Sequence, residues 1–142
     1  MYRERPKFHR NAEGTAAIEF AIIAPVFILM LFGMIAFGIW LGAANTIQQV
    51  TAGAARASVA GLTSKEREAL ARDYVTNSLL ANGLIDVDRV DVSVAEDPDV
   101  DDRFRVTVTF DATHLPIWDL IGSDLLPGQQ IQREAVIVVG GR

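Results

Sequence analysis

The sequence predicts an α+β protein with a long N-terminal transmembrane helix, a second short helix and a small antiparallel sheet of about three strands. Three observations lead to this fold class. Residues 20–44 form an apolar run without a single charge. Residues 63–83 carry helix-capping signals at both ends. Two later segments alternate apolar and polar side chains at every second position, as half-buried strands do.

The apolar run, residues 20–44, is long enough to cross a membrane. A helix of this length reaches roughly 37 Å, compared with roughly 30 Å for the hydrocarbon core of a bilayer. A cleavable secretory signal peptide has an apolar core of only about 7 to 15 residues. The run is therefore too long for a signal peptide of that kind, and a signal anchor is the simpler alternative.

The charges around the run predict its orientation. Residues 1–14 carry four basic and two acidic side chains, namely Arg3, Arg5, Lys7, Arg10, Glu4 and Glu13, whereas the first charge after the run is Arg56. Short cytoplasmic flanks are rich in Lys and Arg, so we expect the N-terminus in the cytoplasm and the C-terminal region across the membrane. The chain has a net charge of −5, and its acidic groups lie mostly after residue 14, which argues against nucleic acid as a partner.

The residues at the start of the run resemble those of a known family. Glu19 lies five residues after Gly14, Phe20 follows it, and Pro25 lies within the uncharged run. In this arrangement GTAAIEFAIIAPVFILMLFG resembles the prepilin class of the type IV pilin superfamily. Together with the later AGAARASVAG, it is similar to the TadE-like pseudopilins of the tight-adherence (Flp) pilus system. The resemblance is dense from Gly14 to Gly61 and thin after that.

This resemblance implies a processing step and a role for Glu19. A prepilin peptidase would cut between Gly14 and Thr15 and remove the basic leader. Glu19, with Phe20 beside it, would then pair with an amine of a neighbouring subunit, which relieves the cost of a carboxylate at the membrane edge. The alternative for Glu19 is a side chain that only reaches the lipid headgroups. The implied partners are the peptidase, other pilins or pseudopilins, the pilus assembly platform and the inner membrane.

Two further features of the run concern its packing. Pro25 lacks an amide hydrogen, so it should kink or loosen the helix near Ala21. Gly38 and Gly42 form a Gly-x-x-x-Gly pair, whose spacing lets two helices approach closely. Because this spacing is frequent in membrane helices, close packing and an incidental pair are both open. Trp40 fits an interfacial anchor.

The helical pattern continues beyond the run and is followed by a second helix. Apolar residues recur at three- and four-residue steps from Ile47 onwards, and Gly61 should end the first helix. Thr63 and Glu66 have the spacing of a capping box, and Asn82-Gly83 supplies a C-terminal stop. The mixed charges of this second helix, Lys65, Glu66, Arg67, Glu68, Arg72 and Asp73, are interpreted as a solvated face.

The remaining chain predicts a small sheet. Alternating patterns indicate strands over residues 90–94 and 104–110, and a last strand over 130–139 whose end suggests burial on both faces. The acidic turn at 96–102 lacks the glycine and distal glutamate of an EF-hand, so we interpret it as a solvated hairpin. The apolar connector 112–128 is either a cover over the sheet or a contact surface.

We therefore expect residues 1–14 to be a cytoplasmic basic leader, 15–61 a transmembrane and extended helix, and 62–142 an exported α+β domain. The chain has no cysteine, and its two histidines, His9 and His114, lack metal-ligand spacing. This predicts a protein without metal, cofactor or enzymatic activity.

The resemblance implies a minor pseudopilin that a prepilin peptidase processes and that takes part in tight-adherence (Flp/type IVb) pilus assembly and surface adhesion. The expected location is the bacterial inner membrane, with a single pass and a periplasmic C-terminal domain. A pilus-associated extracellular position is a second possibility. The alternative function is that of an uncleaved, signal-anchored exported domain that binds a ligand or an envelope partner.

Overall fold

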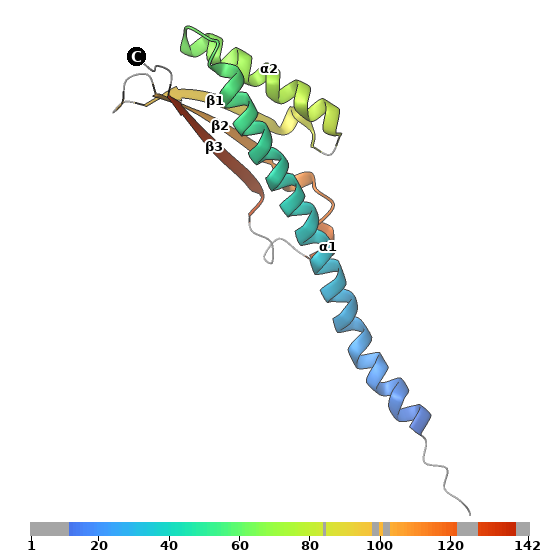
Figure 1. The fold of residues 1–142 in the computed structure, drawn as a ribbon. Helices are drawn as coiled ribbons and strands as arrows, with labels where there is room; N and C mark the ends of the chain where they lie inside the picture. The colour runs from blue at the N-terminus through green and yellow to red at the C-terminus, as the bar shows by residue number, and fades with distance from the viewer. Residues whose placement is uncertain (1–11, 84, 98–99, 101–102, 122–127, 139–142) are drawn as a thin grey trace, which may run out of the picture.

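A computed structural model describes residues 12–83, 85–97, 100, 103–121 and 128–138. It has the predicted α+β fold, with a long N-terminal helix, a second helix and one three-stranded antiparallel sheet. In chain order the elements are α1 (Ala12–Ser58), α2 (Ser64–Asn82), the 3-10 helix η1 (Val87–Arg89), β1 (Val90–Glu96), β2 (Arg103–Asp111), the 3-10 helix η2 (Ala112–His114), α3 (Trp118–Ile121) and β3 (Gln130–Val138). Figure 1 shows α1 projecting far beyond the domain that its C-terminal half joins.

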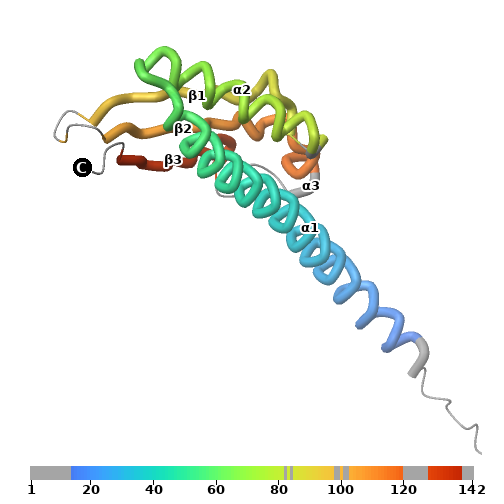
Figure 2. The backbone as a smooth tube through the Cα atoms, turned by 45° about the horizontal axis from the view of Figure 1, so that its top comes forward, coloured from blue at the N-terminus to red at the C-terminus, as the bar shows by residue number. Residues whose placement is uncertain are grey.

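The domain consists of two layers. The strands lie in the order β1-β2-β3, and each neighbouring pair is antiparallel. The C-terminal half of α1 and the whole of α2 cover one face of this sheet (Figures 1 and 2). One continuous core joins the three elements, and it includes Ala43, Ile47, Ala54, Ala71, Val75, Leu79, Val92, Phe104, Val106, Val108, Phe110 and Ile131.

The predicted ends of α2 are confirmed. Thr63 accepts a hydrogen bond from the Glu66 backbone N–H, while the Glu66 carboxylate accepts one from the Thr63 N–H, which completes the capping box. Such a cap contributes about 1 kcal/mol. Gly83 closes the other end with φ of 66°, a left-handed conformation that favours glycine. α1 ends at Ser58, three residues before Gly61, and a turn whose Gly61 N–H donates to the Ser58 carbonyl leads into α2.

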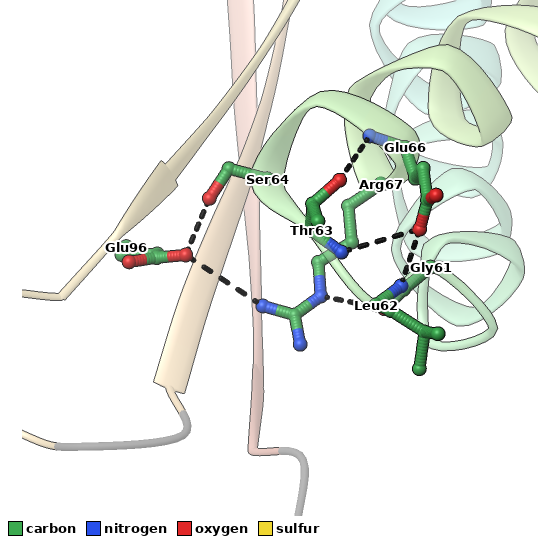
Figure 3. A network of polar contacts seen from close by, with 7 residues as sticks. All are labelled: Gly61, Leu62, Thr63, Ser64, Glu66, Arg67 and Glu96. Atoms are coloured by element: carbon green, nitrogen blue, oxygen red, sulfur yellow. Dashed lines mark hydrogen bonds and ion pairs between the residues drawn. The ribbon is translucent and has the colours of Figure 1, made fainter.

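The interpretation of Arg67 as part of a solvated face is wrong. Its side chain is only 14% exposed, and its guanidinium lies over the Phe104 ring. Figure 3 shows the guanidinium between the Gly61 carbonyl, which accepts from Nε at 3.1 Å, and the Glu96 carboxylate, 3.9 Å from Nη1. Ser64 donates a hydrogen bond to the same carboxylate. This network fastens the α1–α2 turn to the end of β1.

The expected burial of β3 on both faces is also wrong. Val136 and Val138 are 51% and 59% exposed, whereas Ile131 on the opposite face is buried. The physical reason is that no element covers the second face of the sheet among the described residues. The apolar end of β3 therefore reflects the β propensity of valine and not two-sided burial.

The connector after β2 covers α1 more than it covers the sheet. Ile117, just before α3, is fully buried against Ala36 of α1, with Leu115 and Trp118 packed beside it. Of the two interpretations of residues 112–128, a cover over the core and a contact surface, the described part favours a cover. Residues 122–127 lie outside the described residues, as do four residues of the acidic turn, 98–99 and 101–102.

Candidate functional site

The candidate site is the uncovered half of α1, residues 14–35. Every large apolar side chain from Ile18 to Ile35 is exposed, with Phe20 reaching 72%. α1 is also the one helix among the described residues that is long and apolar enough to cross a membrane. A soluble domain rarely exposes an apolar surface of this extent, so this half of the helix requires an apolar partner.

The length of the uncovered half matches a bilayer. Its 14–35 range corresponds to roughly 33 Å of helix, close to the roughly 30 Å of a hydrocarbon core. On the side of α1 that faces the connector it ends at Ala36, which is fully buried against Ile117, whereas Phe37 and Leu41 remain 49% and 43% exposed. The apolar run in the sequence is longer because its last part, with Ala43 and Ala44, forms part of the core of the domain. Only the tertiary structure shows which apolar residues of α1 remain exposed and which are buried in the core of the domain.

Gly14 and Thr15 lie in the first turn of α1, which begins at Ala12. Both residues are exposed and helical. Glycine is a poor helix former, by about 1 kcal/mol relative to alanine. Unwinding the helix at Gly14 into the extended strand that a protease binds therefore costs less than it would at an alanine. Residues 1–11 of the expected leader lie outside the described residues.

Glu19 and Phe20 lie on the surface of the uncovered half. Glu19 is exposed and has no hydrogen bond or ion pair with any residue that the structure describes. No other acidic or basic residue lies between it and Arg56 on α1. A single carboxylate at the edge of an apolar helix either reaches water and headgroups or pairs with a charge from another molecule.

The structure describes Pro25, Gly38 and Gly42 within one uninterrupted helix. A kink at Pro25 remains a prediction. Gly38 and Gly42 are exposed, and a Cβ atom added at either position would meet no atom within 4 Å. They therefore lie on the side of α1 that faces away from the domain, where a second helix has room to approach. Trp40 is half-buried, and its indole N–H donates to the Gly128 carbonyl at 3.3 Å.

The described part of the domain presents no cluster of three or more metal-ligating side chains. Its ionic groups instead form structural contacts. Asp111 caps η2 by accepting a hydrogen bond from the Thr113 N–H at 3.0 Å, and Arg89 lies 3.7 Å from the other carboxylate oxygen. The hydrogen bonds from Thr113, first of all, and then the Arg89 charge lower the pKa of the Asp111 carboxyl below its usual value. These contacts position the connector.

Gly14, Glu19 and the exposed apolar helix that follows are the features on which the resemblance to TadE-like proteins rests. Residues 14–56 match the family model for TadE-like protein. The match confirms the resemblance over this segment, which comprises nearly all of α1. The TadE-like segment begins at Gly14 and contains Glu19, Pro25, Gly38 and Gly42.

The matched range ends within α1, so α2, the sheet and the connector lie outside it. No curated protein and no solved structure matches this chain. The match therefore shows a TadE-like segment over α1 alone, and the single apolar helix is compatible with single-pass membrane anchoring. The sequence interpretation placed Arg67 on a solvated face, and it expected the connector with Ile117 to cover the sheet without identifying Ala36 as its partner, because both contacts join segments far apart in the chain.

Proposed function

We propose that this chain is a minor pseudopilin of the tight-adherence (Flp/type IVb) pilus, cleaved between Gly14 and Thr15 by a prepilin peptidase. The observation that carries the proposal is the TadE-like match, which begins at Gly14 and runs through Glu19. The product takes part in pilus assembly and in surface adhesion as a substrate of the peptidase and not as an enzyme.

The exposed geometry of α1 supports this role. The uncovered half is anchored in the inner membrane before assembly, and its length fits the hydrocarbon core. Inside a pilus the same surface packs against the helices of other subunits, which replace lipid with apolar side chains. Glu19 then pairs with an amine of a neighbouring subunit and sets the axial register of the two helices, because a buried charge requires a partner.

The proposed topology follows from the charges. Residues 1–14 form the cytoplasmic leader, residues 15–61 the transmembrane and extended helix, and residues 62–142 the periplasmic domain. The four basic residues of the leader favour the cytoplasmic side. After the leader is removed, the new amine of Thr15 and the Glu19 carboxylate are the charged groups of the segment that precedes Arg56. This leaves the helix free to pass from the bilayer into a bundle.

Intact mass spectrometry of the protein extracted from membranes tests the proposal. In cells with a working prepilin peptidase, the wild-type chain should have lost residues 1–14. Gly14→Arg should retain them, because a long charged side chain does not fit a cleft that accepts glycine. Ala12→Arg is the matched control: it adds the same charge two residues upstream and should be cleaved normally.

Two results contradict the proposal. Full-length wild-type protein in those cells favours an uncleaved, signal-anchored domain that binds a ligand or an envelope partner. Equal cleavage of the Gly14→Arg and Ala12→Arg variants shows that another bond is cut.

A further inference from the structure

The domain has a cluster of apolar and aromatic side chains directly above the uncovered half of α1. We define this collar as Phe37 and Trp40 of α1 together with Leu115, Pro116, Ile117 and Trp118 of the connector. Ile117 is fully buried against Ala36, with Trp40, Leu115 and Trp118 packed around the pair. Figure 1 shows α3 beside α1 at the end of the domain that lies nearest the uncovered half.

The collar lies at a defined height along α1. The hydrocarbon core covers residues 14–35 when the Glu19 side chain extends back along α1 to the headgroups of the first leaflet. The next turn of the helix, residues 36–40, then lies in the opposite headgroup layer, which is roughly 5 to 7 Å thick on each side. One helical turn rises about 5.4 Å. α1 continues without a break into the domain, so no linker separates the domain from the lipid surface. The segment packed on this turn therefore lies at headgroup level.

The chemistry of the collar suits this layer. Both tryptophans of the chain lie in it, and tryptophan favours the membrane–water interface because its ring is apolar and its N–H is polar. The Trp118 indole donates to the Ala112 carbonyl at 2.6 Å, which fixes its ring within the connector. Phe37 stacks against Trp40 with ring centres 6.3 Å apart, and it remains 49% exposed.

An acidic side chain next to the collar limits its depth. Asp119 directly follows Trp118 in the connector and is exposed. A charged side chain is costly within hydrocarbon and tolerated near the interface. The collar therefore contacts the headgroups and the outermost acyl carbons, and it does not enter the hydrocarbon core.

We propose that the exposed side of the collar, formed by Phe37, Pro116 and the uncovered edges of the half-buried Trp40, Leu115 and Trp118 around the buried Ile117, is a lipid-binding surface on which the domain rests in the headgroup layer of the membrane. The surface is continuous with the membrane-facing surface of α1, and it holds the domain at one height and one orientation above the bilayer. This inference rests on the proposed membrane anchoring of α1 and adds to it a second lipid contact, from the connector.

The chain contains no cysteine, so single cysteines can carry a fluorophore at chosen positions. Pro116→Cys probes the collar, and Leu31→Cys probes the membrane-spanning part of α1. Ala95→Cys probes an exposed position on β1. It lies next to Glu96, at the end of the domain that the Glu96 contacts join to the α1–α2 turn. The full-length labelled variants are reconstituted into vesicles of phosphatidylethanolamine and phosphatidylglycerol. The lipids carry a quencher either at the headgroup or at the middle of the acyl chain. The circular dichroism spectrum of each labelled variant is compared with that of the wild type to confirm folding.

We expect the headgroup quencher to be the stronger quencher of the label at 116, the mid-chain quencher to be the stronger at 31, and neither to act on the label at 95. If the label at 116 behaves like that at 95 while that at 31 is quenched, the collar proposal is wrong and the anchoring stands. If the label at 31 also escapes both quenchers, the anchoring itself is wrong. Stronger mid-chain quenching at 116 overturns the placement in the headgroup layer.

Discussion

The guanidinium of Arg67 lies over the ring of Phe104, with its central carbon 4.7 Å from the ring centre. Phe104 is fully buried, so the charge of Arg67 covers one end of the core where α2 meets β2. A cation over an aromatic ring contributes about 0.5 to 1 kcal/mol when exposed and about 2 kcal/mol when desolvated. This contact makes the α1–α2 turn part of the folded domain.

Arg67→Ala should lower the free energy of unfolding by about 2 to 3 kcal/mol, since it removes the contact with the ring and leaves the Gly61 carbonyl without its donor. Chemical unfolding of the full chain in detergent measures the loss. Lys65→Ala, an exposed change on the same helix, should cost less than about 0.5 kcal/mol. Equal effects of the two substitutions would show that the Arg67 contacts contribute nothing to stability.

Gly53→Ala tests the contact between α1 and α2. A Cβ atom at position 53 would overlap the outer end of the Tyr74 ring. Because Tyr74 is 40% exposed and its ring can rotate away, the overlap should cost no more than about 1 kcal/mol. In the background of Tyr74→Ala the same substitution should instead stabilise by up to about 1 kcal/mol, because alanine is the better helix former. Thermal unfolding of the four variants gives the comparison. Destabilisation of the same size in both backgrounds would refute the proposed clash.

Asp111 predicts a dependence of stability on pH. Its folded pKa is lowered from 3.8 by hydrogen bonds from Thr113 and by the Arg89 charge. The stabilisation is therefore present above pH 3.8 and is lost as the pH falls through the lower folded pKa. Asp111→Asn should have a lower Tm than wild type at neutral pH, and the difference should narrow at acidic pH.

Asp73→Asn is the control for this experiment. Asp73 is an exposed carboxylate on α2 without a hydrogen bond or ion pair to the residues that the structure describes. Its replacement should leave Tm close to wild type at neutral pH. A constant Tm difference for Asp111→Asn at every pH would mean that the charge of Asp111 is not responsible.

Glu19→Gln tests the pairing role. The amide keeps the size of the side chain and removes its charge, so cleavage after Gly14 should be normal while recovery of the chain with sheared pili falls by about tenfold. A hydrogen bond to a charged group contributes about 1.5 to 3 kcal/mol, which corresponds to such a change. Glu19→Asp, which keeps the charge, should give an intermediate recovery. Wild-type recovery for Glu19→Gln would argue that Glu19 only reaches the headgroups.

Gly42→Leu tests close packing of the helix. Position 42 is open within the chain, so the domain should keep its Tm while the leucine prevents a second helix from approaching. We expect cross-linking to other pilus subunits to fall severalfold. Gly42→Ala keeps a small side chain and should retain most of the cross-linking. Unchanged cross-linking of Gly42→Leu would identify the Gly38 and Gly42 pair as incidental.

Much of the fold is determined locally and was therefore predictable. The capping box of Thr63 and Glu66, the left-handed Gly83 and the alternation of the strands each depend on neighbours within a few residues. The candidate site was proposed in the same way, because Gly14 and Glu19 lie on one helix whose pattern is contained in a single segment, and the roles of these two residues stay predictions. The local features determined α+β as the fold class and predicted the apolar helix as the candidate site.

Only the tertiary structure decided how far the apolar run serves the membrane and where it joins the core. Ala36 divides the two because Ile117, some eighty residues later, packs on it. Arg67 packs over Phe104 at the edge of the core and Val136 remains exposed for a similar reason, because burial depends on which distant segment covers a residue. Sequence periodicity reports which face of an element is apolar, whereas the partner of that face is determined only when the chain folds.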